Sequence, residues 1–143
     1  MTPAKSVPLL TVGLVLLMAS STATADVVAV VSSRSTITML TTNQLADIFL
    51  GRTNRFPNGE PAVPIDQAEG SVARDRFYGR VAGKSAAQMK AYWSKIIFTG
   101  RGQPPRAVAN SEEAKETLVQ NLNAVGYIEQ NLVDASVRVL LTP

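Results

Sequence analysis

The chain has 143 residues and contains neither cysteine nor histidine. Without cysteine it forms no disulfide and has no thiol nucleophile, so its folding relies on packing alone. Without histidine it lacks the commonest general base and the commonest metal ligand. No serine lies in the G-x-S-x-G pattern of a nucleophile elbow, and no pair of carboxylates is marked by its spacing. We therefore expect a protein that is not an enzyme and that binds neither a metal nor a cofactor.

Charge is also sparse. The 14 lysine and arginine residues stand against 11 acidic residues, which gives a net charge of +3. The basic residues are scattered, whereas proteins that bind nucleic acids gather them into a patch or a stripe. The sequence therefore predicts no nucleic-acid partner.

Residues 1–25 have the layout of a secretory signal peptide. Lys5 supplies positive charge, residues 7–18 form an apolar run, and Ala23-Thr24-Ala25 is a small-x-small cleavage site. The run is shorter than the roughly 20 residues of a membrane span, and a retained N-terminal anchor is the alternative. We predict cleavage after Ala25, export to the periplasm and a single domain over residues 26–143.

The rest of the chain alternates between strand and helix patterns. The pairs Thr41 with Gln44 and Ser85 with Gln88 are capping boxes that begin amphipathic helices. Two further helices are expected to begin near Ser71 and at residues 110–111. Apolar runs predict strands at residues 27–31, 63–65, 124–128 and 137–141. This order predicts an α/β domain with a mostly parallel sheet flanked by helices.

The segment from Ala62 to Phe77 is the most informative in the chain. It predicts a short strand, a turn closed by Gly70 and Ser71, and a helix whose first N–H groups have no partner. Such a helix start attracts anions, because the N–H groups and the positive end of the helix dipole point the same way. The loop at Ser33 and Arg34 also follows a strand, so the two loops are candidates for one common site.

Four segments resemble the phosphate-type substrate-binding proteins of ABC transporters, which have the type II periplasmic-binding fold. Residues 45–52 resemble the family's L-x-x-I-F-x-G-K/R helix end, and residues 63–77 resemble its strand, Gly-Ser turn and helix. Residues 124–128 resemble its A-I-G-Y-V strand, and residues 93–100 are similar to short relatives with a single lobe. The resemblance implies one lobe of such a binding protein.

The family's phosphate segment reads R-x-D-G-S-G-T. Gly70 and Ser71 match it, Glu69 stands at the acid, and Gln67 stands at the arginine. The remaining two positions of the segment are occupied by Val72 and Ala73. The resemblance thus implies an anion site at Gln67, Glu69, Gly70 and Ser71.

Glutamine lacks the bidentate, charged grip of arginine on an oxyanion. Arg74 in the first helical turn, or Arg34 beside Ser33 in the first loop, is a candidate to replace it. The alternative for each residue is structural, with Ser71 as a helix cap, Glu69 as a solvated acid and Arg34 as a loop residue.

The function implied is that of an exported protein that binds phosphate or a similar oxyanion beside an ABC permease. A homodimer is one way to supply the second lobe of the longer relatives. The alternative is a periplasmic interaction module, or the partner of a sensor, that kept the fold.

Overall fold

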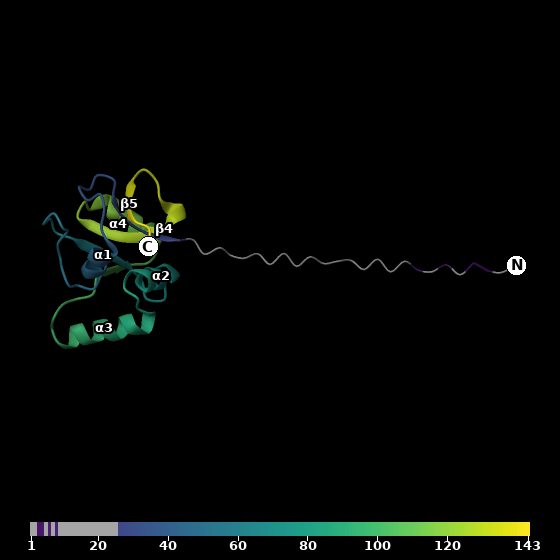
Figure 1. The fold of residues 1–143 in the computed structure, drawn as a ribbon, viewed down its shortest axis with the longest axis horizontal. Coiled ribbons are helices and arrows are strands. Elements are labelled where there is room, and N and C mark those ends of the chain that lie inside the picture. Colours follow the sequence, from purple (N-terminus) through teal and green to yellow (C-terminus); the bar gives the residue numbers. More distant parts are fainter. Residues whose placement is uncertain (1–2, 5, 7, 9–25) are drawn as a thin grey trace.

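The computed structural model describes residues 3–4, 6, 8 and 26–143, and the segment from residue 26 forms an α/β domain (Figure 1). The predicted signal peptide lies almost entirely outside the described residues. The strands are β1 (Val27–Ser32), β2 (Val63–Gln67), β3 (Arg106–Val108), β4 (Ala124–Glu129) and β5 (Val137–Leu141). The helices are α1 (Thr42–Phe49), α2 (Val72–Val81), α3 (Ala86–Phe98), α4 (Ser111–Gln120) and the short 3-10 helix η1 (Gln130–Leu132). In the part of the chain that is described, no helix has the length and apolar character needed to cross a membrane.

The strands form one sheet in the order β3-β2-β4-β1-β5. β2 pairs in parallel with β3 and β4, whereas β1 pairs antiparallel with β4 and β5. Four strands therefore run in one direction and β1 runs against them. This confirms the predicted single α/β domain with a sheet flanked by helices. The sheet is mixed rather than mostly parallel, because the reversed β1 makes two of the four strand pairings antiparallel.

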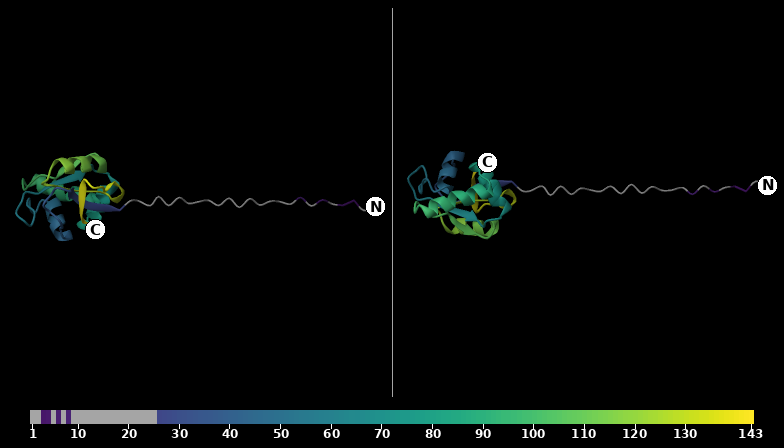
Figure 2. Two further views of the ribbon diagram at one scale, coloured as in Figure 1. Left: turned by 90° about the horizontal axis from the view of Figure 1, so that it is seen from above. Right: turned by 90° about the horizontal axis from the view of Figure 1, so that it is seen from below.

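Helices cover both faces of the sheet. β1 is buried on both faces, as its unbroken apolar run predicts. Val27, Ala29 and Val31 pack with α1, α2 and α3, whereas Val28 and Val30 pack with α4. Figure 2 shows α4 on one side of the sheet and α1 on the other. Two apolar cores, one on each face, hold the helices to the sheet.

Aromatic side chains fill the core beneath α1 and α2. The rings of Phe77 and Tyr127 stack with their centroids 4.1 Å apart, and Phe49 meets Phe77 edge-on at 4.7 Å. Phe77 and Tyr127 are almost completely buried, so they contribute both apolar area and specific ring geometry. Phe77, which keeps the spacing of the resembling segment, is therefore a core residue that seats α2 on the sheet.

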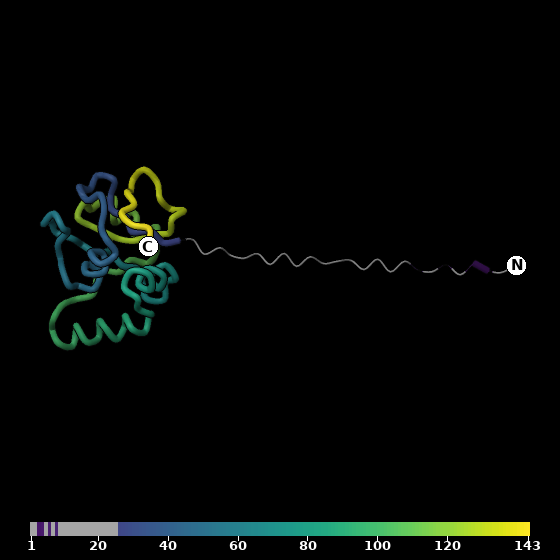
Figure 3. Tube along the Cα trace, viewed as in Figure 1, coloured from purple at the N-terminus to yellow at the C-terminus, as the bar shows by residue number. Residues whose placement is uncertain are grey.

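The two ends of the described domain lie close together. The Arg80 guanidinium donates both to the Asp26 carboxylate and to the backbone carbonyl of Pro143. Figure 3 shows the same proximity of the C-terminus to the start of β1. Residues at both ends are thus attached to the last turn of α2.

The sequence predicted most of these elements and missed one strand. Both capping boxes are present, at Thr41 and at Ser85, and Asn110 is the cap of α4. β3 was missed because it has three residues, two of them exposed, and follows Pro104-Pro105 directly. Such a segment shows no alternation of apolar and polar residues.

Gly51 ends α1 in a conformation that favours glycine, and replacing it tests the packing of α3. Its φ is +72°, and a Cβ added there would lie 3.1 Å from Cη2 of Trp93. We expect Gly51→Ala to lower the free energy of unfolding by about 2 kcal/mol, measured by chemical denaturation, because backbone strain and crowding of the indole add up.

Gly59→Ala is the matched control for that substitution. Gly59 has a φ of +87°, but no heavy atom lies within 4 Å of its added Cβ. Gly59→Ala is expected to lower the free energy of unfolding by only about 1 kcal/mol, because it adds backbone strain without crowding. Equal losses in the two variants would contradict a role for the Trp93 contact.

Candidate functional site

The carboxyl ends of β2 and β3 form the crevice in which α/β sheets commonly bind ligands. The chain leaves β2 for α2 on one face of the sheet and leaves β3 for α4 on the other. A change of face between neighbouring parallel strands opens a crevice at their carboxyl ends. The starts of α2 and α4 both lie at this crevice, and their first N–H groups make it electropositive.

A tight turn joins β2 to α2. Gly70 has a φ of +91°, which is why glycine suits this position. Ser71 is the N-cap, and its Oγ accepts a 3.3 Å hydrogen bond from the Arg74 backbone N–H. The turn fixes the direction in which the first turn of α2 faces the crevice.

Gln67 occupies the crevice between the two helix starts. Its side chain faces α4, because alternate residues of β2 face opposite sides of the sheet. Its Nε2 donates to Ser111 Oγ and to the Tyr127 carbonyl, each at 3.1 Å, and its Oε1 accepts from Ser71 Oγ at 3.1 Å. Gln67 is almost completely buried. The residue at the family's arginine position is therefore a buried link between β2, α2, α4 and β4.

Asp66 faces the opposite side of the sheet, toward α2. Its buried carboxylate accepts hydrogen bonds from the Tyr78 hydroxyl at 2.6 Å, from the Tyr127 hydroxyl and from the Gln67 backbone N–H at 2.8 Å. The carboxylate is almost completely shielded from solvent, since Asp66 is 3% exposed. Three donors compensate the loss of water around this charge.

The tyrosines of this cluster are held in their neutral form. Burial raises the pKa of Tyr78 well above its ordinary value, and the adjacent Asp66 charge raises it further. Burial and the Asp66 charge raise the pKa of Tyr127 in the same way. Both hydroxyls therefore remain donors to Asp66 at neutral and moderately alkaline pH.

Arg74 is the cationic group of the site. Its Nε lies 3.5 Å from Asp66 Oδ2, and its guanidinium lies over the Tyr78 ring, 5.4 Å from the ring centroid. Its side chain is 12% exposed, yet its guanidinium makes no hydrogen bond within the described part of the chain. The backbone N–H groups of Val72 and Ala73 likewise have no partner among the described residues. Unused donors from three residues thus gather at the start of α2.

The remaining residues of the predicted site are placed differently. Glu69 is exposed and lies 3.8 Å from Lys90 Nζ, in an ion pair open to solvent. Ser33 and Arg34 follow β1, which runs against β2, so they lie at the opposite end of the sheet. There the Arg34 guanidinium donates to the Val119 carbonyl near the end of α4. The expectation of one common site for both loops is wrong because β1 is reversed.

The sequence reasoning missed Asp66, Tyr78, Tyr127 and Ser111. Asp66, the one charged residue of β2, was the available signal, because a buried carboxylate needs partners. The side-chain partners of Asp66 are Tyr78 from α2 and Tyr127 from β4, the latter 61 positions away in the sequence. Ser111 of α4 is a partner of Gln67. No group of three or more acidic, cysteine or histidine residues able to hold a metal occurs among the residues that are described.

Comparisons with known proteins give a likeness of fold. No family model and no curated protein matches the chain. A phosphate ABC transporter substrate-binding protein with bound phosphate from Clostridium perfringens is similar over 81% of this chain and 44% of its own, with a TM-score of 0.63 and 23% identity. An ABC-type phosphate transport receptor from Vibrio cholerae is similar over 81% and 45%, with a TM-score of 0.63 and 20% identity. PstS from Borrelia burgdorferi is similar over 81% and 46%, with a TM-score of 0.55 and 17% identity.

This chain thus spans less than half the length of each of these proteins. It has the fold of one lobe of a phosphate-type substrate-binding protein. The structures it resembles are named as binding and transport proteins.

Proposed function

We propose that this chain, which has the fold of one lobe of a phosphate-type binding protein, is an exported oxyanion-binding module that works beside an ABC permease. Phosphate or a similar oxyanion binds at the start of α2. The proposal rests on Arg74, a mostly buried cation whose guanidinium has no hydrogen-bond partner within the described part of the chain. A bound phosphate in one of the similar proteins supports the class of ligand.

The donors divide into groups that hold the anion and groups that shape the site. Arg74, which pairs with Asp66 but makes no side-chain hydrogen bond to a described residue, holds the oxyanion together with the N–H groups of Val72 and Ala73. The side chains of Gln67 and Ser71 are hydrogen-bonded to each other and to neighbouring elements, so they position the turn. Binding at this site thus depends on one side-chain cation and a helix start.

The affinity of such a site is expected to be low and sensitive to salt. Asp66 lies 3.5 Å from the Arg74 Nε and competes with an incoming anion for that cation. One lobe leaves the anion in contact with water, where charge pairs are weak and screened. The proposed ligand is therefore held in the millimolar range, which corresponds to roughly 4 kcal/mol of binding free energy.

A titration with inorganic phosphate, followed by amide nuclear magnetic resonance, tests the proposal. We expect saturable shifts confined to residues 70–74, with an apparent Kd that rises at higher salt. Arg74→Gln is expected to weaken binding about tenfold, because a charge-assisted contact is lost. Arg80→Gln is the matched control on the same helix, since Arg80 lies at the far end near Asp26.

Arg74→Lys shows whether a loss of phosphate binding in Arg74→Gln is caused by misfolding. It keeps a cation beside Asp66, so it is expected to retain the dispersed spectrum of the parent and part of the binding. Equal affinities in the parent and the Arg74→Gln variant would contradict the proposed site. So would shifts spread evenly over the surface of the domain.

One observation favours a second function. Gln67 and Ser71 are saturated by internal hydrogen bonds, so the family's anion segment is here a connection between elements. This arrangement suits a periplasmic interaction module that kept the fold. A titration with phosphate and with sulfate that moves no resonance near α2 would favour this function over the first.

A further inference from the structure

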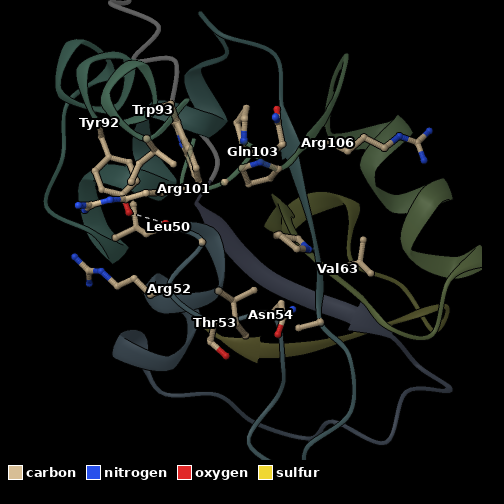
Figure 4. Close-up of a pocket in the computed structure, with 18 residues that line it drawn as sticks. Leu50, Arg52, Thr53, Asn54, Val63, Tyr92, Trp93, Arg101, Gln103 and Arg106 are labelled. Atoms are coloured by element: carbon tan, nitrogen blue, oxygen red, sulfur yellow. Dashed lines mark hydrogen bonds between the residues drawn. The ribbon is translucent and has the colours of Figure 1, made fainter. Parts of the chain in front are cut away.

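A second concave site lies away from the crevice, toward the amino end of β2. It is a pocket of about 650 Å³ between the end of α1, helix α3 and the loop that leads into β3 (Figure 4). Val63 and Pro64 from the beginning of β2 form one wall. The oxyanion groups described above follow the other end of β2, so the two sites do not share a residue.

The walls of this pocket are largely apolar. Most of its lining residues are apolar or aromatic, and the large ones among them are Ile48, Leu50, Val63, Tyr92, Trp93 and Ile96. The Tyr92 hydroxyl donates to the Leu50 carbonyl at 2.6 Å, which fixes its ring between α3 and the end of α1. Val63 is 37% exposed, although it is a large apolar residue. A volume of this size with such a lining is typical of sites for small molecules.

The charge on the lining is of one sign. Arg52, Arg101 and Arg106 line the pocket, and no aspartate or glutamate does. Arg52 and Arg101 extend toward the same side, near Tyr92, whereas Arg106 extends toward the opposite side (Figure 4). Two cations at one rim of an apolar cavity complement a ligand with an apolar body and an anionic end.

Both rim arginines are available to a ligand. Arg101 makes no side-chain hydrogen bond or ion pair with any residue that the structure describes. Arg52 pairs with Asp47 at 3.3 Å, but both side chains are about half exposed. Exposed ion pairs of this kind contribute little to stability, so an incoming anion can displace Asp47 from Arg52 at little cost in free energy.

The adjoining edge of the sheet does not favour an added peptide strand. β3 pairs with β2 only from Ile65 onward, which leaves Val63 and Pro64 without a strand neighbour on that side. Pro64 has no N–H, and the Val63 N–H already donates to the Asn123 carbonyl. Val63 and Pro64 therefore offer no free main-chain N–H group to a peptide along the pocket. The ligand is instead selected by the shape of the pocket and by its charge.

We propose that this pocket binds a small organic anion, with a flat apolar body against Tyr92 and Trp93 and a carboxylate or sulfonate at Arg52 and Arg101. Aromatic acids of the size of a two-ring compound are the class that fits. This ligand class differs from the oxyanion proposed at α2, because a free inorganic ion has no apolar body to contact these walls.

Trp93 makes the test specific, since it is the single tryptophan of the chain and lines the pocket. The probe is anilinonaphthalene sulfonate, and the signals are quenching of Trp93 emission and energy transfer to the probe. Its neutral analogue phenylnaphthylamine has a similar body without the sulfonate. We expect saturable binding of the anionic probe to the intact protein, and weaker binding of the neutral one.

Variants test whether the anionic probe binds at the rim arginines. Arg52→Gln and Arg101→Gln are each expected to weaken the anionic probe about threefold to tenfold and to leave the neutral analogue unchanged. Arg106→Gln is the control, because its side chain lines the pocket but extends the other way. Excess phosphate at constant ionic strength is expected not to displace the probe. Equal binding of the two probes, or an Arg106→Gln loss as large as the others, would overturn the proposal.

Discussion

Replacing Asp66 with alanine is expected to lower the free energy of unfolding by about 3–5 kcal/mol, the usual result of removing one partner from a buried charge cluster. The carboxylate accepts from Tyr78, Tyr127 and the Gln67 N–H, and it lies beside the Arg74 guanidinium. Its loss leaves two buried hydroxyls without their acceptor and Arg74 without its counter-charge. Urea denaturation followed by circular dichroism measures the difference.

Conservative variants separate the charge from the hydrogen bonds. Asp66→Asn keeps the shape and one acceptor, so it is expected to lose less than the alanine variant. Tyr78→Phe and Tyr127→Phe each remove one hydrogen bond to a charged group and are expected to lose about 1.5–3 kcal/mol. Tyr127→Phe also removes the hydroxyl that accepts from the Gln67 backbone N–H at 3.1 Å, so its loss is expected to be the larger. The sum of the two losses is not expected to equal the Asp66→Ala loss, because the three residues form one network. A loss below about 1 kcal/mol for Asp66→Ala would show that the cluster does not stabilise the fold.

The same cluster explains which parts of the fold the sequence could predict. Periodicity and capping residues are local signals, and they predicted α1, α3 and α4 with their caps at Thr41, Ser85 and Asn110. The reversal of β1 depends on which strands pair, and no local signal carries that information. The short β3 depends on its pairing with β2 in the same way.

The candidate site was predictable in part for a related reason. The turn at Gly70, the cap at Ser71 and the helix start are local features, and the structure places them as the sequence indicates. The partners of Gln67 are distant in sequence, with Ser111 44 positions away and Tyr127 60 positions away. Sequence reasoning therefore assigned Gln67 as a ligand, whereas its hydrogen bonds make it a structural link. Arg74, the candidate replacement for the missing arginine, lies beside the buried Asp66 and is the cation of the proposed site.

The stability of the domain is expected to fall steeply with rising pH above about pH 10. Tyr78 and Tyr127 have a pKa raised above their ordinary value of 10.0 by burial and by Asp66. Below pH 10 both are protonated in the folded and the unfolded chain, so their stabilising effect is fully present. Above it the unfolded chain releases protons that the folded chain keeps, so each tyrosine lowers the free energy of unfolding by about 1.4 kcal/mol per pH unit.

Two such tyrosines together give a slope of about 2.7 kcal/mol per pH unit and a loss of about 3 kcal/mol by pH 11. Urea denaturation at a series of pH values measures the slope, and phenolate absorbance shows whether ionisation coincides with unfolding. Tyr78→Phe and Tyr127→Phe are each expected to halve the contribution of the pair, even though both variants are less stable at neutral pH. Apart from the replaced tyrosine the three proteins have the same sequence, so the difference in slope is assigned to that tyrosine. Parallel curves for the parent and the variants, or phenolate absorbance from both residues before unfolding, would mean that Asp66 and burial do not keep these hydroxyls neutral.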